Sequence, residues 1–494
     1  MTKRSAKSLA PRRPLGALGR ACAVVALPVA ILGWSSTASA QGWLADRRYA
    51  EGPGIRTGDL ELHPGIGGEV GYDSNWFLRS HKEGPNIVNG PPRLPPAEAA
   101  VFRLTPSFYI STVGAQRTDV AGMTRAEPRT IAFRGGISAT GRAFLGSADV
   151  RKQANISIAS DARLDINQGR PIGVGIWGGY NRLIQPQVAA DPNLSFNRDD
   201  LRAGAELVAL PGGGTLDIRG GYQINAALFE ESNGVPYSNV THEIMVKNRW
   251  RFRPRTALFS DTSLRFINYP NADRAVMYLN DSTPLRTRFG LTGLLTERFG
   301  ALLAAGYGAT FFKNPRAVSS PQYDSINAQV EGTFYLGQGG GADEPGQATL
   351  LLSTVSLGFL RDFQNSLLGN FYNTNRVYGR LEYWFGGRTV IRLDAYGEQL
   401  NYPPVFYSTG GVPALQVNEF SNFRVGGGLF AEYRFTSSFG INTTIDYIQQ
   451  ISDTQLPVAA LAGGAPGAPP AATGEVFDLN YRRLQAFVGA RYFF

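Results

Sequence analysis

The chain has 494 residues, with 48 Lys and Arg against 39 Asp and Glu. Six of the basic residues and the only cysteine, Cys22, fall within the first 40 residues, which leaves 42 basic against 39 acidic residues in the rest. This near balance argues against nucleic acid as a partner. The lack of cysteine after residue 40 excludes disulfides and thiolate metal sites from that part.

Residues 1–40 have the three parts of a secretory signal peptide. A basic start precedes an apolar run, Ala21 to Trp34, and small residues end the segment at Ala40. The apolar run is shorter than the roughly 20 residues that a membrane-spanning helix needs. We therefore expect cleavage before Gln41 and export from the cytoplasm.

The rest of the chain shows an apolar period of two. In Phe423–Phe435 and again in Ile441–Tyr447, apolar or aromatic residues alternate with polar, charged or small ones. One face of such a strand suits lipid and the other suits water, which is typical of a transmembrane strand. No segment after residue 40 has 18 consecutive apolar residues, as a spanning helix would need. Closed strands, in contrast, satisfy every backbone group within lipid.

This alternation predicts an all-β fold, a transmembrane antiparallel up-and-down β-barrel over residues 62–494. We expect about 18 strands, or roughly 16 to 20, because short and long connections alternate like periplasmic turns and extracellular loops. Residues 41–61 are expected to form a short N-terminal segment that stays in the periplasm or enters the lumen as a plug. The expected strands are 62–72, 101–113, 130–141, 153–164, 171–181, 200–210, 214–226, 239–252, 256–268, 285–296, 301–312, 325–336, 348–361, 374–385, 388–400, 420–435, 439–450 and 478–494.

The last strand carries a candidate assembly signal. Its apolar face ends in Tyr492 and Phe494. A terminal aromatic residue after alternating apolar ones looks like the signal read by the bacterial barrel-assembly machinery, so we expect that machinery and outer-membrane lipid as partners. A soluble β-sandwich or propeller also alternates, but charges on the second face of nearly every strand, and the terminal aromatic residue, disfavour it.

If lipid covers the apolar face, the charged face lines the lumen. Barrels of this size are wide enough to leave an aqueous channel unless something plugs them. An arginine excess would favour anionic solutes, whereas charges paired across strands would mainly hold the wall in register. The candidate lumen-lining residues are Arg249, Arg251, Arg265, Arg288, Arg380, Glu382, Arg392, Asp394, Arg424, Glu432, Arg434, Asp446 and Arg491.

The sequence offers little for catalysis. The three histidines, His63, His81 and His242, have no partner motif nearby, and no spacing indicates a catalytic triad or a metal site. The glycine-rich string 173–179 alternates as a strand and does not resemble a phosphate-binding loop. We therefore expect no enzyme, no cofactor and no bound metal.

The string Gly67–Phe77, which reads GGEVGYDSNWF, resembles the opening strand of a family of outer-membrane β-barrel porins. In that family an alternating strand runs into a turn of the pattern Tyr-Asp-x-Asn-(aromatic or Ile)-Phe. Members often accompany machinery that exports exopolysaccharide or capsule. The resemblance therefore implies an exit pore for secreted polysaccharide and periplasmic export components as partners, and it supplies no catalytic residues.

Three functions follow for a barrel in the bacterial outer membrane. The first is the polysaccharide exit pore, which needs aromatic residues in the lumen; Phe430, Tyr335 and Phe487 are in phase for that role. The second is a passive porin for small, preferentially anionic solutes. The third is a structural barrel that anchors an envelope complex, in which the lumen arginines would be fully paired.

Overall fold

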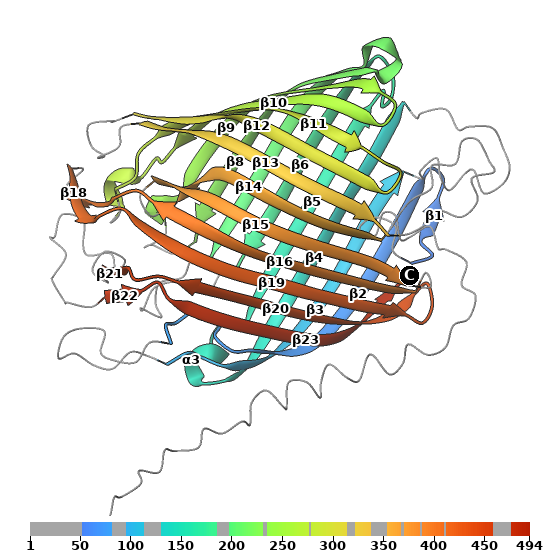
Figure 1. Ribbon diagram of the computed structural model, residues 1–494. Helices are drawn as coiled ribbons and strands as arrows, with labels where there is room; N and C mark the ends of the chain where they lie inside the picture. The colour runs from blue at the N-terminus through green and yellow to red at the C-terminus, as the bar shows by residue number, and fades with distance from the viewer. Residues whose placement is uncertain are drawn as a thin grey trace, which may run out of the picture.

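The computed structural model describes residues 52–81, 95–112, 130–184, 197–230, 235–275, 278–313, 322–336, 353–366, 370–385, 388–409, 412–457 and 476–494. Within these residues one antiparallel sheet closes on itself, because the last long strand pairs with the first (Figure 1). The strands of this barrel are β2 (Leu60–Asp73), β3 (Ala99–Thr112), β4 (Ile131–Gly146), β5 (Asn155–Ile166), β6 (Ile172–Leu183), β7 (Arg198–Ala209), β8 (Leu216–Phe229), β9 (Asn239–Arg253), β10 (Thr256–Asn268), β11 (Ser282–Leu294), β12 (Phe299–Phe312), β13 (Gln322–Tyr335), β14 (Thr354–Ser366), β15 (Asn370–Phe385), β16 (Thr389–Tyr402), β19 (Phe420–Arg434), β20 (Phe439–Ile451) and β23 (Tyr481–Phe493). The predicted fold class and the predicted number of 18 strands are confirmed.

Large apolar side chains cover the outer face of the barrel. Val70 is 62% exposed, Phe289 64% and Leu357 66%, and exposed apolar residues recur at every second position of most strands. An apolar surface this extensive is covered by lipid in a transmembrane barrel. The protein is thus a barrel of the bacterial outer membrane. Among the described residues, the helices are all too short or too polar to cross a membrane themselves.

One end of the barrel holds the short turns, the start of the first barrel strand and the end of the last one. In the turn between β7 and β8, three consecutive glycines (212–214) adopt positive φ angles, which glycine reaches without steric cost. A further short strand, β1 (Ile55–Thr57), pairs with the start of β2, and the Gly54 backbone N–H donates to the Phe494 carbonyl over 3.0 Å. The expected signal peptide (1–40) and residues 41–51 lie outside the described residues.

The long connections indicate that the opposite end is the extracellular one, and this end carries more structure than the sequence predicted. The connection expected as a loop over 401–419 contains a hairpin of β17 (Val405–Thr409) and β18 (Val412–Val417). The connection over 451–477 begins and ends in β21 (Gln455–Pro457) and β22 (Val476–Asp478), which pair with each other. Several of these connections share an apolar cluster that includes Leu279, Val405 and Tyr237. Burial there, with Asp281 nearby, raises the pKa of Tyr269 to about 12.

The Asp73-Ser74-Asn75 turn fastens the first extracellular connection to the last strand. The Ser74 backbone N–H donates to the Leu484 carbonyl over 2.9 Å, and the Asn75 side-chain amide donates to the Arg482 carbonyl over 3.0 Å. Trp76, which follows, packs against Phe144 with its ring 4.5 Å away, inside a buried cluster that also holds Phe487. The motif that carries the family resemblance therefore joins the two strands that close the barrel.

The hairpin of β14 and β15 leaves the wall near its extracellular end. β14 pairs with β13 only as far as Arg361, whereas its pairing with β15 continues to Ser366. Beyond Arg361 the hairpin packs on the inner face of β12: Phe363 is 2% exposed, and a Cβ added to Gly308 would meet its ring at 2.4 Å. The Arg286 guanidinium donates to the Phe363 carbonyl over 2.6 Å. Part of this hairpin thus narrows the lumen from within.

Candidate pore lining

Most predicted lumen residues form ion pairs between strands of the wall. The printed sequence shows them alternating with the outward apolar residues. The pairs join neighbouring strands, strands two apart in the case of Arg491–Glu432, or nearby positions on one strand. The pairs are Arg265–Glu243 (2.9 Å), Arg288–Asp261 (2.9 Å), Arg380–Asp394 (2.7 Å), Arg392–Glu382 (3.3 Å), Arg424–Glu398 (3.3 Å), Arg491–Glu432 (2.9 Å) and Arg434–Glu432. Asp446 lies close enough to Arg103 and Arg483 to interact with both. These ion pairs neutralise most of the charge on the inner wall.

The lumen is not filled by these side chains. The side chains of Arg380 and Asp394 are 63% and 49% exposed although they form an ion pair, and the side chain of Arg392 is 40% exposed. Side chains that point inward from a closed wall reach water only where the interior leaves room for it. Glu432 and Arg434 differ, because both are buried at the periplasmic end, where the Arg434 guanidinium lies 4.3 Å from the ring of Phe493.

Four cations on two strands that flank β8 have no acidic partner within ion-pair distance among the described residues. They are Arg202 on β7 and Lys247, Arg249 and Arg251 on β9, and all four are exposed. Arg249 and Arg251 belong to the predicted set. Arg219 lies on β8, the strand between β7 and β9. It forms an ion pair with Asp217 over 2.9 Å and lies 3.6 Å from Glu206. Positive charge is therefore in excess on one side of the lumen, while the rest of the wall is largely neutral.

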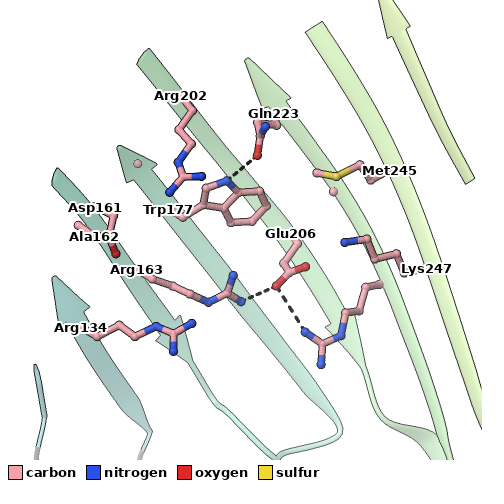
Figure 2. A pocket seen from close by; sticks show the side chains of 13 residues that line it. Arg134, Asp161, Ala162, Arg163, Trp177, Arg202, Glu206, Gln223, Met245 and Lys247 are labelled. Atoms are coloured by element: carbon pink, nitrogen blue, oxygen red, sulfur yellow. Dashed lines mark hydrogen bonds and ion pairs between the residues drawn. The ribbon is translucent and has the colours of Figure 1, made fainter. Parts of the chain in front are cut away.

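A hollow of about 370 Å³ lies within this cationic wall (Figure 2). Trp177 lines it, and its ring lies against Gly204, where an added Cβ would come within 2.5 Å of the indole. The indole N–H donates to the Gln223 side-chain oxygen over 2.8 Å. Arg163, Arg202 and Lys247 are also part of the lining. Sequence reasoning did not single out Trp177, because only the strand register places a glycine opposite it.

The glycine-rich string of β6 gives these side chains the space to lie along the wall. A Cβ on Gly175 would meet the Arg163 guanidinium at 2.7 Å, and one on Gly179 would meet Arg202 at 2.8 Å. Both glycines share the inward face with Trp177. The string is a strand, as the sequence predicted, and its small residues allow the wall to carry large cations.

The remaining sequence-based candidates lie apart from this hollow. His63 is buried near Glu61, with 3.9 Å between Nε2 and the carboxylate, at the start of β2. His242 contacts the Tyr222 hydroxyl over 2.6 Å through Nδ1, and His81 follows the first turn. Where the structure describes the chain, no group of three or more His, Cys, Asp or Glu is placed to hold a metal ion.

The aromatic residues expected to serve a sugar path are not equally accessible. Phe487 is 1% exposed, because the Arg103 guanidinium lies 3.4 Å from its ring centre. It therefore cannot stack with a solute. Phe430 and Tyr335 are half-buried. Phe430 lines a hollow of the inner wall together with Arg491, and Tyr378, which covers Gly358, is a further ring on that wall.

No family model matches this sequence, and no curated protein sequence matches it. Among solved structures it is similar to a BenF-like porin from Pseudomonas fluorescens, with 10% identity over 88% of this chain and 99% of that chain and a TM-score of 0.41. It is similar to OccAB4 of Acinetobacter baumannii, with 10% identity over 90% of this chain and 100% of that one and a TM-score of 0.41. It is also similar to the FrpB iron transporter of Neisseria meningitidis, with 8% identity, coverage of 92% and 83%, and a TM-score of 0.40. Similarity at this level carries no argument about solutes.

Proposed function

We propose that the protein is a passive, water-filled channel of the outer membrane that favours anionic solutes. The observation that carries this proposal is the set of four cations, Arg202, Lys247, Arg249 and Arg251, that face the lumen without an acidic partner among the described residues. Cations held in a low-dielectric wall attract anions and raise their local concentration. The exposed side chains of paired residues elsewhere in the wall support a hydrated interior. We propose transport and not catalysis.

The test is ion selectivity in planar bilayers, using protein purified from outer membranes. A salt gradient of potassium chloride should give a reversal potential that reports preference for chloride. Replacing the four cations together by glutamine should shift the selectivity towards potassium, because the wall loses its excess charge. The matched control is the double variant Arg380→Gln/Asp394→Asn, which removes an exposed ion pair and leaves the net charge unchanged. Its selectivity should stay that of the parent protein.

Two outcomes would contradict the proposal. A cation-selective parent channel would mean that the four cations do not set the potential of the path. A folded barrel that carries no current would leave the structural role, in which the barrel anchors an envelope complex, as the better account.

Export of polysaccharide is a second candidate, supported by aromatic rings along the lumen wall. Trp177 lies over Gly204 and Tyr378 over Gly358, and sugar rings stack on such faces. Acidic oligosaccharides added on the periplasmic side should then interrupt the current in discrete events. Current that small anions carry without such interruptions would favour the passive channel, and periplasmic export components would drop out as proposed partners.

A further inference from the structure

We infer that the hollow beside Trp177 binds a carboxylate carried on a six-membered ring, either aromatic or sugar. This inference deepens the proposed anion channel and rests on it. The channel would admit anions in general, and the hollow would slow those that carry a ring. The argument has three parts: a stacking face, a pair of available cations and a size limit.

Trp177 provides the stacking face. Its ring lies against Gly204 on one side, and the indole N–H bond to Gln223 fixes its orientation. The Gln223 side-chain N–H in turn donates to the Asn225 side-chain oxygen over 2.8 Å. This second hydrogen bond fixes the Gln223 side chain that orients the indole. The ring remains partly exposed in the lining of the hollow (Figure 2). The Arg163 guanidinium lies 5.5 Å from the ring centre and leaves part of the ring open. A fixed aromatic face of this kind stacks with aromatic rings and with the C–H face of a sugar ring.

Arg202 and Lys247 provide the charge. Figure 2 shows Trp177 between Arg202 and Arg163, with Lys247 on the far side of the hollow. Arg163 is held by Asp165 over 2.8 Å and by Glu206 over 2.5 Å, so its charge is already neutralised. Arg202 and Lys247 have no such partner among the described residues. They are left to bind an anion that comes from outside the protein.

The chemistry of these groups and the size of the hollow narrow the ligand. Guanidinium and ammonium groups only donate hydrogen bonds, so they favour a carboxylate, which only accepts them. The hydroxyls of a neutral sugar need acceptors as well. A volume of about 370 Å³ admits one ring and lies at the small end of ligand pockets. One ring with one carboxylate satisfies all three conditions.

The test measures how well small acids block the chloride current of single channels. The probes are benzoate and glucuronate, which carry a ring and a carboxylate, with acetate and glucose as controls that lack one of the two. At least one ring acid should half-block the current at a concentration roughly ten times lower than acetate, the effect of stacking on a fixed ring. Block by benzoate alone would identify an aromatic acid as the ligand, and block by glucuronate alone a sugar acid.

Two kinds of variant assign the block to the hollow. Trp177→Leu should raise the half-blocking concentration of the ring acid roughly tenfold and leave that of acetate unchanged. The matched control is Trp250→Leu, which removes the same ring from the lipid face of β9, where the side chain is exposed. Lys247→Gln should weaken the block by ring acids and by acetate alike. Because Lys247 is exposed, this variant should fold even if Trp177→Leu does not.

The inference is overturned if ring acids block no better than acetate, or if the variants at Trp177 and Trp250 behave alike. Either result could come from a channel that still prefers chloride over potassium, and the proposed anion channel would then stand. Loss of chloride preference in the parent protein would instead remove the proposed function itself.

Discussion

The carboxylate of Asp73, at the end of the first barrel strand, accepts hydrogen bonds from Nε and Nη2 of Arg483 on the last strand, with 3.0 Å to Nε. The Asp73 side chain is fully buried and that of Arg483 is 13% exposed. The same carboxylate accepts the backbone N–H of Asn75 over 3.0 Å and the side-chain amide of Gln485 over 2.8 Å. One acidic group thus ties the seam of the barrel and holds the first extracellular turn.

Replacing Asp73 by asparagine should lower the free energy of unfolding by about 3–5 kcal/mol, because it leaves the largely buried Arg483 guanidinium without the carboxylate to which it is hydrogen-bonded. Urea unfolding of the protein in lipid vesicles, followed by tryptophan fluorescence, measures this change. The control is Asp394→Asn, which breaks the exposed pair with Arg380 and should cost about 0–1 kcal/mol. Equal losses for the two variants would contradict the structural role given to the seam.

Gly204→Val should push the Trp177 ring off the wall and into the lumen, because even a Cβ at residue 204 would come within 2.5 Å of the indole. We expect a smaller single-channel conductance and altered fluorescence of Trp177. Gly220→Val is the control, since a Cβ there meets nothing within 4 Å, and it should leave both readings unchanged. Unchanged conductance in both variants would show that the ring does not border the conducting path.

Phe363→Ala should release the inward-packed part of the β14–β15 hairpin. The ring of Phe363 is 2% exposed, and together with Phe312 and Phe371 it forms the contact that holds the hairpin on the inner wall. We expect a larger and noisier conductance, measured in planar bilayers. Phe359→Ala removes a ring from the lipid face of the same strand and should not change the conductance. If Phe359→Ala changes the conductance as much as Phe363→Ala does, the effect does not come from the hairpin in the lumen.

Phe494→Ala should reduce assembly into the outer membrane if the terminal aromatic residue is the signal that the assembly machinery reads. In the folded barrel this side chain is 50% exposed and meets the Tyr492 ring edge-on at 4.8 Å. The loss of folded-state contacts should therefore be small. The yield of folded protein in outer membranes is the measurement, and Phe439→Ala, another exposed aromatic residue near the same end, is the control. Normal yield with Phe494→Ala would remove the predicted partner.

The strands could be predicted closely because lipid constrains one face of each. Strand β10 was predicted over 256–268, and the structure has Thr256–Asn268. A shift by one residue would turn every apolar side chain towards water, so the alternation fixes the phase. Two strands end five residues later than predicted: β4 at Gly146 and β14, predicted to end at 361, at Ser366. The pairing of β14 with β13 does end at Arg361, and the strand then continues in the hairpin that packs inside. Nothing in local periodicity signals that departure from the wall.

The site was harder to predict, because it depends on which residues meet across strands. Arg249 and Arg380 are alike in sequence context, as inward residues of strands that alternate. Only the register gives Arg380 the partner Asp394 and leaves Arg249 without an ion pair to its neighbour Asp217, which binds Arg219 instead. Trp177 gains its role in the same way, from the glycine that the register places opposite it.

The pairing of β2 with β23 also sets the order in which the chain can mature. Residues that meet there, such as Val70 and Val488, are joined by almost the whole length of the polypeptide, so loop closure makes this contact entropically the most expensive in the fold and the slowest to form. Until the final strand arrives, a nascent sheet presents two open edges that could pair with any other extended chain. We therefore expect folding to need a partner that covers those edges until the last strand pairs with the first.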